Sequence, residues 1–428
     1  MVKHILFSKQ QNEQPNPQKI LLLLGAPFTK QNYERIGIPF LARSFTVIVF
    51  QCMHWIERSS VPLNLVEENW ELYEEVESEK QFAQLLENYK PDYAIDFIGL
   101  NPFSPKIGQI LKSQNVKLVV QKLGSLPHDR ELYIRFKRKL NSKIEFNSQK
   151  SLQVKSDLNV SFWAKLDLKS KHALIYMKQR LNQKLLPFKL RLKTPYITLL
   201  AGNKSRSILT RMAKKTIWAS SNDFHTFQKV NRVNGSLYPK DYLVFLDDCL
   251  TQALDWTTLK MSPPVISNLY FSQLNGFFQM LEDEHSISVV IAGHPNTVND
   301  KFYSNNFNGR DVIYGKTAEL VLYSRSVLLH ASTSVSYAIL SRKPITSIIS
   351  KELDLSHYGK SIRSVSRAVG SNLVFMDVNY KDKILSSQID LRKYKSYEIN
   401  FLRNQHSNED NPWDTFTDFV LRRRLGKL

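Results

Sequence analysis

The stretch VVIAGHPN (Val289–Asn296) begins the segment that decides the fold, which continues as FNGRDVIYGKTAELVLYSRS (Phe307–Ser326) and VLLHASTSVSYAILSRKP (Val327–Pro344). Its two apolar runs end on polar residues, at His294-Pro295 and at His330, and a Ser/Thr-rich helix start follows the second run. Parallel strands that are buried on both faces have continuous apolar sequences. Open α/β sheets bind their ligands beyond the carboxyl ends of such strands. The segment therefore predicts a parallel sheet with a ligand site at this edge.

Apolar runs and helical patterns alternate along the rest of the chain. Further strands are predicted at Ile20–Leu24, Phe45–Phe50, Tyr93–Ile98, Val116–Val120, Tyr196–Leu200, Thr216–Ala219, Tyr242–Leu246, Ile345–Ile349 and Asn372–Met376. Helices are predicted near Lys80–Tyr89, Lys106–Ser113, Asn268–Glu284 and Trp413–Leu425. Such alternation is typical of a doubly wound α/β sheet, and 428 residues suffice for two domains of about 200 residues each.

We therefore predict an α/β protein with two Rossmann-like domains and an active site in the cleft between them. The N-terminal domain is expected over residues 1–235, which end at the turn signal Asn234-Gly235. The C-terminal domain is expected over residues 236–405, followed by a basic helix over 406–428. The chain contains neither a GxGxxG nor a Walker A pattern, which weakens the usual dinucleotide and P-loop interpretations.

The chain is strongly basic, with 59 Lys and Arg against 39 Asp and Glu and a net charge of +20. This charge favours anionic partners, such as phosphorylated substrates, an anionic membrane surface or nucleic acid, although plain solubility is an alternative. Residues 130–193 are rich in Lys and Arg, and they predict basic amphipathic helices that suit an anionic membrane face. A solvated helical face is the alternative. Nucleic acid is not predicted, because no nucleic-acid-binding signature accompanies the charge.

Cysteine usage and apolar runs limit the setting of the protein. Cys52 and Cys249 belong to no CxxC or Cys/His cluster, so neither a disulfide framework nor a zinc site is predicted. The longest apolar run, Ile20–Leu24, is far shorter than the roughly 20 residues of a membrane span, and the first residues do not predict a secretory signal. We expect a cytoplasmic protein, peripheral on the inner face of the cell membrane where its basic segments bind, and a reaction without a metal or another cofactor.

Ser332, Thr333 and Ser334 stand where a helix begins after a buried strand. The unpaired N–H groups and the dipole of a helix start favour an anion, and neighbouring hydroxyls add donors. Ser and Thr are also preferred N-cap residues, so plain capping is the alternative. Three hydroxyls together favour a phosphate site.

His294 leaves the predicted sheet at the same edge, and Pro295 fixes the backbone beside it. An imidazole there can donate to a phosphate oxygen or to a nucleotide base, although a lone histidine is often structural. Further candidates in the segment are cations that could neutralise a leaving phosphate, and a carboxylate that could accept from ribose hydroxyls or serve as a first-turn charge. The cations are Arg310, Lys316 and His330, and the carboxylate is Glu319.

Asp247 and Asp248 follow the apolar run YLVFL and are the candidate reactive carboxylates. A carboxylate that faces an anomeric carbon can act as a general base towards an acceptor hydroxyl, or as a nucleophile. A turn or a helix cap is the alternative, and it explains one aspartate more easily than two. The sequence does not distinguish between the two aspartates.

The succession FLDD, GHPN and HASTS resembles the acidic, His-Pro and Ser/Thr motifs of bacterial sialyltransferases and Kdo transferases, which are GT-B enzymes that use CMP-activated sugars. The pieces NYERIGIPFL, FNGRDVIYGKTAELV and HASTSVSYAILSRKPI look like those of glycosyltransferases encoded in bacterial surface-polysaccharide loci. The first resemblance implies that His294 and residues 332–334 hold CMP, and that Asp247 or Asp248 carries the chemistry. The expected donor is a CMP-activated nonulosonic or ulosonic acid.

The expected acceptor is a glycan or a lipid-linked glycan of a surface polysaccharide, held mainly by the N-terminal domain. Candidate acceptor residues are Tyr33, Glu34, Arg35, His128 and Asp129. Two alternatives stay open. CDP-glycerol or CDP-ribitol phosphotransferases of teichoic-acid assembly have a similar C-terminal layout. A non-catalytic GT-B-like protein that binds a membrane complex is the other.

Overall fold

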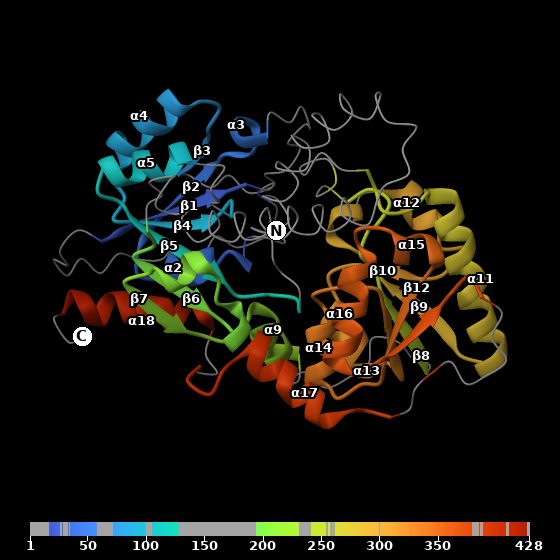
Figure 1. The fold of residues 1–428 in the computed structure, drawn as a ribbon. Coiled ribbons are helices and arrows are strands. Elements are labelled where there is room, and N and C mark those ends of the chain that lie inside the picture. The colour runs from blue at the N-terminus through green and yellow to red at the C-terminus, as the bar shows by residue number, and fades with distance from the viewer. Residues whose placement is uncertain are drawn as a thin grey trace, which may run out of the picture.

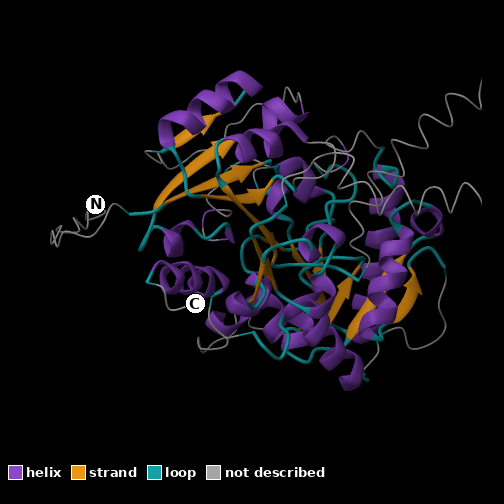
Figure 2. Cartoon of the chain, turned by 60° about the vertical axis from the view of Figure 1, so that its left-hand side comes forward, coloured by secondary structure: helices purple, strands orange, loops and turns teal. Residues whose placement is uncertain are grey.

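In a computed structural model of the protein, two parallel β-sheets are each flanked by helices (Figure 1). Figure 2, turned by 60° about the vertical, shows the same strands with helices outside them. The structure describes residues 17–25, 28, 33, 35–57, 72–99, 105–127, 194–230, 241–253, 256, 262–298, 300–378, 385, 388–407 and 411–425. The predicted α/β class with two Rossmann-like sheets is confirmed.

The first sheet has seven strands among the described residues, in the order β3-β2-β1-β4-β5-β6-β7, and every pair is parallel. The strands are β1 (Lys19–Leu24), β2 (Thr46–Gln51), β3 (Tyr73–Glu75), β4 (Tyr93–Phe97), β5 (Lys117–Lys122), β6 (Ile197–Leu200) and β7 (Lys215–Trp218). The helices of this part are α2 (Ile38–Leu41), α3 (Met53–Glu57), α4 (Glu79–Tyr89), α5 (Pro105–Ser113), η1 (Asn203–Ser205), α8 (Ile208–Arg211) and α9 (Asn222–Val230).

The second sheet has six strands within the described part, in the parallel order β10-β9-β8-β11-β12-β13. The strands are β8 (Tyr242–Leu246), β9 (Ser288–Ala292), β10 (Val312–Ile313), β11 (Ser326–Leu329), β12 (Ile345–Ile349) and β13 (Asn372–Phe375). The helices are α11 (Ser267–His285), η2 (Pro295–Thr297), α12 (Lys301–Asn305), α13 (Thr317–Tyr323), α14 (Val335–Leu340), α15 (Lys351–Leu355), α16 (Gly359–Val369), α17 (Leu391–Tyr397), η3 (Glu398–Leu402) and α18 (Pro412–Arg424).

The strand order of the second sheet reverses between β8 and β11. From β8 the chain adds β9 and β10 on one side, and from β11 it adds β12 and β13 on the other. Such a switch point leaves a crevice at the carboxyl ends of the two strands, where doubly wound sheets bind their ligands. The segment that follows β8 is the aspartate pair, and the segment that follows β11 is the Ser/Thr-rich turn.

Two helices pack into the core of the other part of the chain. Phe227 and Val230 of α9, which follows the first sheet, belong to the hydrophobic core of the second sheet. Trp413 and Phe416 of α18, near the end of the chain, lie in the core of the first sheet. The final helix therefore crosses back to the first sheet, as Figure 1 shows for the red helix beside β6 and β7.

A close backbone contact adds to this exchange. The π-helical turn η3 packs on η1, and the Ser221 amide donates to the Leu402 carbonyl over 2.7 Å. A Cβ atom at Gly202 would lie less than 3.0 Å from the backbone of Asn400 and Phe401. The contact therefore requires a residue without a side chain at position 202.

Each predicted strand overlaps an observed one and ends within two residues of it, because buried parallel strands have apolar runs that define them. Strand β3 was missed. It lies at the edge of the sheet within the acidic segment Glu67–Glu79, and its half-exposed residues have no apolar run. The predicted hinge at Asn234-Gly235 and the basic segment 130–193 fall outside the described residues.

We expect Gly202→Ala to lower the stability of the protein by about 1–3 kcal/mol, because the added methyl group forces the η3 backbone away from η1. Gly276→Ala is the control. This glycine is exposed in α11 with nothing within 4 Å of an added Cβ, so the change should raise stability by roughly 0.5–1 kcal/mol. Thermal unfolding measures both. A Gly202→Ala protein with the same melting temperature as the wild type would refute the close contact between η3 and η1.

Candidate functional site

The three polar segments singled out in the sequence follow adjacent strands, in the order β9, β8 and β11. Asp247 and Asp248 follow β8, His294 follows β9, and residues 332–334 follow β11. Asp247 and Asp248 bond across these strand ends to His294 and Ala331 respectively. The predicted neighbourhood of the three segments is therefore confirmed.

Asp247 is a buried carboxylate that ties strand ends together. One of its oxygens accepts from the Cys249 amide over 3.0 Å and from the Tyr303 hydroxyl over 3.0 Å. The other accepts from the His294 amide over 3.4 Å. Burial raises the pKa of Asp247 to about 6, and these three donors oppose the rise. These hydrogen bonds make Asp247 a link between the strand ends, and its catalytic role stays a prediction.

Asp248 is only half-buried and lies at the switch point of the sheet. Its Oδ2 accepts from the Ala331 amide over 2.8 Å, beyond the end of β11, and from the Tyr358 hydroxyl over 3.1 Å. Burial raises the pKa of Asp248 to about 7, the Asp247 charge adds to the rise, and the donors, among them Ser332, lower it. A carboxyl group with a pKa near neutrality can take up a proton and release it again at physiological pH. Of the two aspartates, Asp248 therefore suits acid-base chemistry better.

His294 is a neutral donor. Its Nδ1 accepts from the Asn296 amide over 3.2 Å, so the ring proton is on Nε2. Burial, and secondarily the charge of Arg35, lower the pKa of His294 to about 4. Pro295, the first residue of η2, is exposed beside it. His294 can therefore donate one hydrogen bond to a ligand but does not bring a positive charge.

The Ser/Thr turn differs from the predicted open helix start. Helix α14 has only six residues, and the Ser334 and Val335 amides bond back to Ser332 over 3.4 Å and 3.2 Å. Thr333 is exposed, and Ser332 and Ser334 are half-buried. The hydroxyls, and not the dipole of a long helix, are thus what this turn can offer to a phosphate.

His330 was predicted as a cation near the ligand, and the structure corrects this. It is fully buried, its Nδ1 donates to the Ile348 carbonyl over 2.7 Å, and its Nε2 accepts from the Tyr270 hydroxyl over 3.0 Å. Burial lowers its pKa to about 4. His330 is therefore a neutral core residue that fixes β11 against β12.

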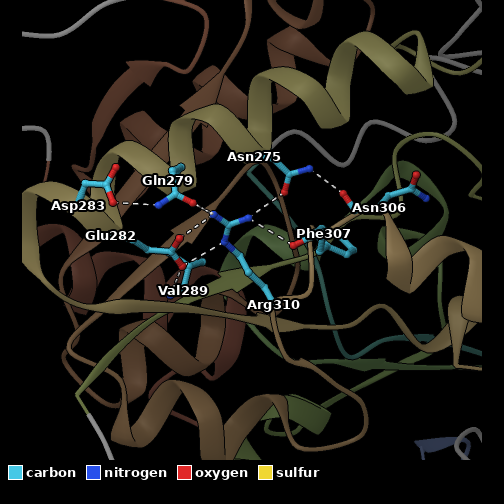
Figure 3. A network of polar contacts seen from close by, with 8 residues as sticks. All are labelled: Asn275, Gln279, Glu282, Asp283, Val289, Asn306, Phe307 and Arg310. Atoms are coloured by element: carbon cyan, nitrogen blue, oxygen red, sulfur yellow. Dashed lines mark hydrogen bonds and ion pairs between the residues drawn. The ribbon is translucent and has the colours of Figure 1, made fainter.

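Arg310 was also predicted to bind phosphate, and its position contradicts this (Figure 3). Its guanidinium pairs with Glu282 over 2.6 Å and bonds to Asn275 over 3.1 Å. Glu282 also accepts from the Val289 amide at the beginning of β9. Arg310 therefore lies at the amino-terminal edge of the sheet, where it joins α11 to the strands.

Lys316 and Glu319 follow β10, which is the outermost strand of the second sheet, and they lie at its carboxyl edge. They pair with each other over 3.4 Å, and Lys316 is about half exposed. Their position is compatible with a ligand contact at the rim, and their predicted roles stay predictions.

Among the acceptor candidates, Tyr33 packs against the core of the first sheet, and Arg35 is exposed. The charge of Arg35 lowers the pKa values of His294 and Asp223, so it acts where the two sheet edges face each other. Glu34, His128 and Asp129 fall outside the described residues.

Asp223 was missed as a site residue. It follows β7 in the run SSND, whose polar character after a strand is the same signal that marked the other segments. Its carboxyl group is hydrogen-bonded to the Ser336 hydroxyl over 2.5 Å, and it accepts from the Tyr337 hydroxyl over 3.4 Å. The carboxyl edge of the first sheet therefore meets that of the second at the beginning of α14.

Two kinds of feature, a cluster of metal ligands and a membrane-spanning helix, are absent from the described residues. No three His, Cys, Asp or Glu side chains there come together as a metal site requires, and the metal-free reaction stays an expectation. None of the helices in that part of the chain is long and apolar enough to cross a membrane.

No protein-family model matches the chain, and no curated protein does. Similar solved structures include a UDP-GlcNAc 2-epimerase from Methanocaldococcus jannaschii, at 12% identity and TM-score 0.44, covering 96% of this chain and 100% of that one. MnaA of S. aureus with UDP has 11% identity and TM-score 0.45, covering 96% and 98%. The glycosyltransferase SnogD from Streptomyces nogalater has 10% identity and TM-score 0.46, covering 95% and 99%. Every TM-score is below 0.5, so no activity or site is carried over to this chain.

The two aspartates should respond differently to replacement by asparagine. Asp247→Asn places an amide group against the His294 N–H and should cost about 1–3 kcal/mol through unpaired buried donors. Asp248→Asn keeps an oxygen for Ala331 and Tyr358 and should fold normally.

The pH dependence of unfolding checks this assignment. Folded Asp248 holds its proton between its ordinary pKa of 3.8 and about 7, whereas the unfolded chain releases it, so stability falls as pH rises through this window. Asp248→Asn should remove that part of the slope. An unchanged slope would contradict the raised pKa.

Proposed function

We propose that the chain is a glycosyltransferase that moves a sugar from a nucleotide donor to a glycan acceptor, at the facing carboxyl edges of its two sheets. The observation that carries the proposal is Asp248, a half-buried carboxyl group with a pKa of about 7 at the switch point of the second sheet. A base at this position can activate an acceptor hydroxyl. Ligand donors stand on both sides of it, at His294 and at Thr333.

In this reaction Asp248 accepts the proton of the acceptor hydroxyl while the oxygen of that hydroxyl forms a bond to the anomeric carbon. The bond from that carbon to the donor phosphate breaks, and its electron pair leaves with the nucleotide. The Nε2–H of His294 and the hydroxyls of Ser332 and Thr333 donate to the nucleotide. Lys316 supplies positive charge near the leaving phosphate.

The resemblance of FLDD, GHPN and HASTS to the motifs of CMP-sugar enzymes favours a CMP-activated nonulosonic or ulosonic acid as the donor. The basic charge of +20 fits an acceptor glycan built at an anionic membrane face, where the protein would be peripherally bound. The exposed Arg35 belongs to the acceptor side of the site in this proposal.

CMP at ten times its Kd should stabilise the folded protein by about 1.4 kcal/mol, because it binds only the native state. For a domain of this size the shift is roughly 3–6 °C in Tm. Differential scanning fluorimetry with CMP, CDP and UDP measures it and ranks the nucleotides. The Asp248→Asn variant should keep the shift. A melting temperature that none of the three nucleotides raises at millimolar concentration would refute the nucleotide site.

Loss of the base should show in turnover more than in binding. We expect Asp248→Asn to lower kcat by about 10²–10⁴-fold, with nucleotide release from CMP-sugars, UDP-sugars and CDP-alcohols followed by mass spectrometry. In the wild type kcat/KM should rise with pH through about 7, the pKa of Asp248. Asp241→Asn is the control, since this exposed carboxylate stands at the other end of β8. Full activity of Asp248→Asn would refute the role of Asp248 as the base, and a wild type that turns over none of these donors would favour a binding protein.

A further inference from the structure

The hydroxyl of Ser336 in α14 bonds to two oxygen atoms. It lies 2.5 Å from Oδ2 of Asp223 and 2.5 Å from the carbonyl oxygen of Thr333. A hydroxyl has one proton and donates fully to one acceptor. If Asp223 were ionised, one of these contacts would bring two oxygen atoms together without a proton between them.

Both contacts are satisfied when Asp223 is protonated. Its carboxyl proton then goes to Ser336, and Ser336 donates to Thr333. The second carboxyl oxygen accepts from the Tyr337 hydroxyl over 3.4 Å, and Tyr337 itself bonds to Thr226. These hydrogen bonds lead from the first domain to the carbonyl of Thr333, in the turn that offers its hydroxyls to the ligand.

Burial of Asp223 favours the protonated form that this arrangement requires. Burial raises the pKa of Asp223, and Ser336, Arg35 and Tyr337 oppose the rise, in that order. Within the described part of the chain, Arg35 is the charged residue that acts on Asp223, and Tyr337, whose pKa is raised, stays neutral. The Arg35 backbone is held in place, because its carbonyl accepts from Asn222 over 3.3 Å and from the Trp413 indole over 3.2 Å.

We infer that Asp223, as a protonated acid, is a positioning residue of the nucleotide site: through Ser336 it fixes the turn 332–334, so the site is complete only when the two domains are in contact. The inference rests on the proposed function for the identity of the ligand. It assigns no chemical step to Asp223.

Asparagine tests this inference sharply, because its amide has the shape and the hydrogen bonding of a protonated carboxyl group. Asp223→Asn should bind CMP within about threefold of the wild type, since its Nδ2–H donates to Ser336. Asp223→Ala and Ser336→Ala should each weaken CMP binding on the order of tenfold, the effect of one lost hydrogen bond. Their effects should not add in the double variant. Asp283→Ala, an exposed carboxylate on α11, is the control.

The pH dependence gives a readout that a merely structural role would not change. As pH rises through the pKa of Asp223, CMP affinity should fall in the wild type relative to Asp223→Asn, and the ratio of the two affinities cancels the ionisation of CMP itself. The inference would be overturned by a ratio that does not change with pH, or by an Asp223→Asn protein that binds CMP as weakly as Asp223→Ala. In either case, CMP binding to the wild type would still support the proposed nucleotide site.

A wild type that binds no nucleotide would refute the proposed function without deciding the role of Asp223. The stability of the same variants then decides it. At low pH the melting temperature of Asp223→Asn should equal that of the wild type. As pH rises it should become the higher of the two, because only the wild type releases a proton from residue 223 when it unfolds. An Asp223→Asn protein that melts with Asp223→Ala at every pH would overturn the protonated acid.

Discussion

The hydrogen bond from the Ala331 amide to Asp248 joins the two strands between which the second sheet reverses its order. Strands β8 and β11 end there, and the chain leaves them in opposite directions, so backbone groups remain without ladder partners. Asp248 pairs with one such amide, and Asp247 does the same for His294 on the other side. The polar segments of the site are therefore held in place by two neighbouring carboxyl groups. Burial raises the pKa values of both.

Much of the fold could be predicted because parallel strands, buried on both faces, have apolar runs that end where a polar segment begins. The same logic placed His294, Asp248 and the Ser/Thr turn at one edge. It failed for Arg310 and His330, because the sequence shows that a residue is near a strand but not whether its side chain faces ligand or core. Arg310 precedes β10 and lies at the opposite edge, and His330 turns into the interior.

Asp223 was missed for a related reason. Its partners Ser336 and Tyr337 lie more than a hundred residues away in the sequence, and no local sequence pattern predicts a contact between domains. The same holds for Gly202, whose only signal is the absence of a side chain. Contacts that join the two sheets depend on tertiary geometry, and they decide which strand-end residues meet.

The packing of α18 has a consequence for the order in which the chain acquires its structure during synthesis. Domains made at the ribosome usually fold from the N-terminus onward. Here the core of the first sheet includes Trp413 and Phe416, which are translated after all the strands of both sheets. The strands of the second sheet are synthesised after those of the first sheet and before α18. Among the described residues, the core of the second sheet includes none from α18. The part of the protein that is synthesised first is therefore the part that is completed last.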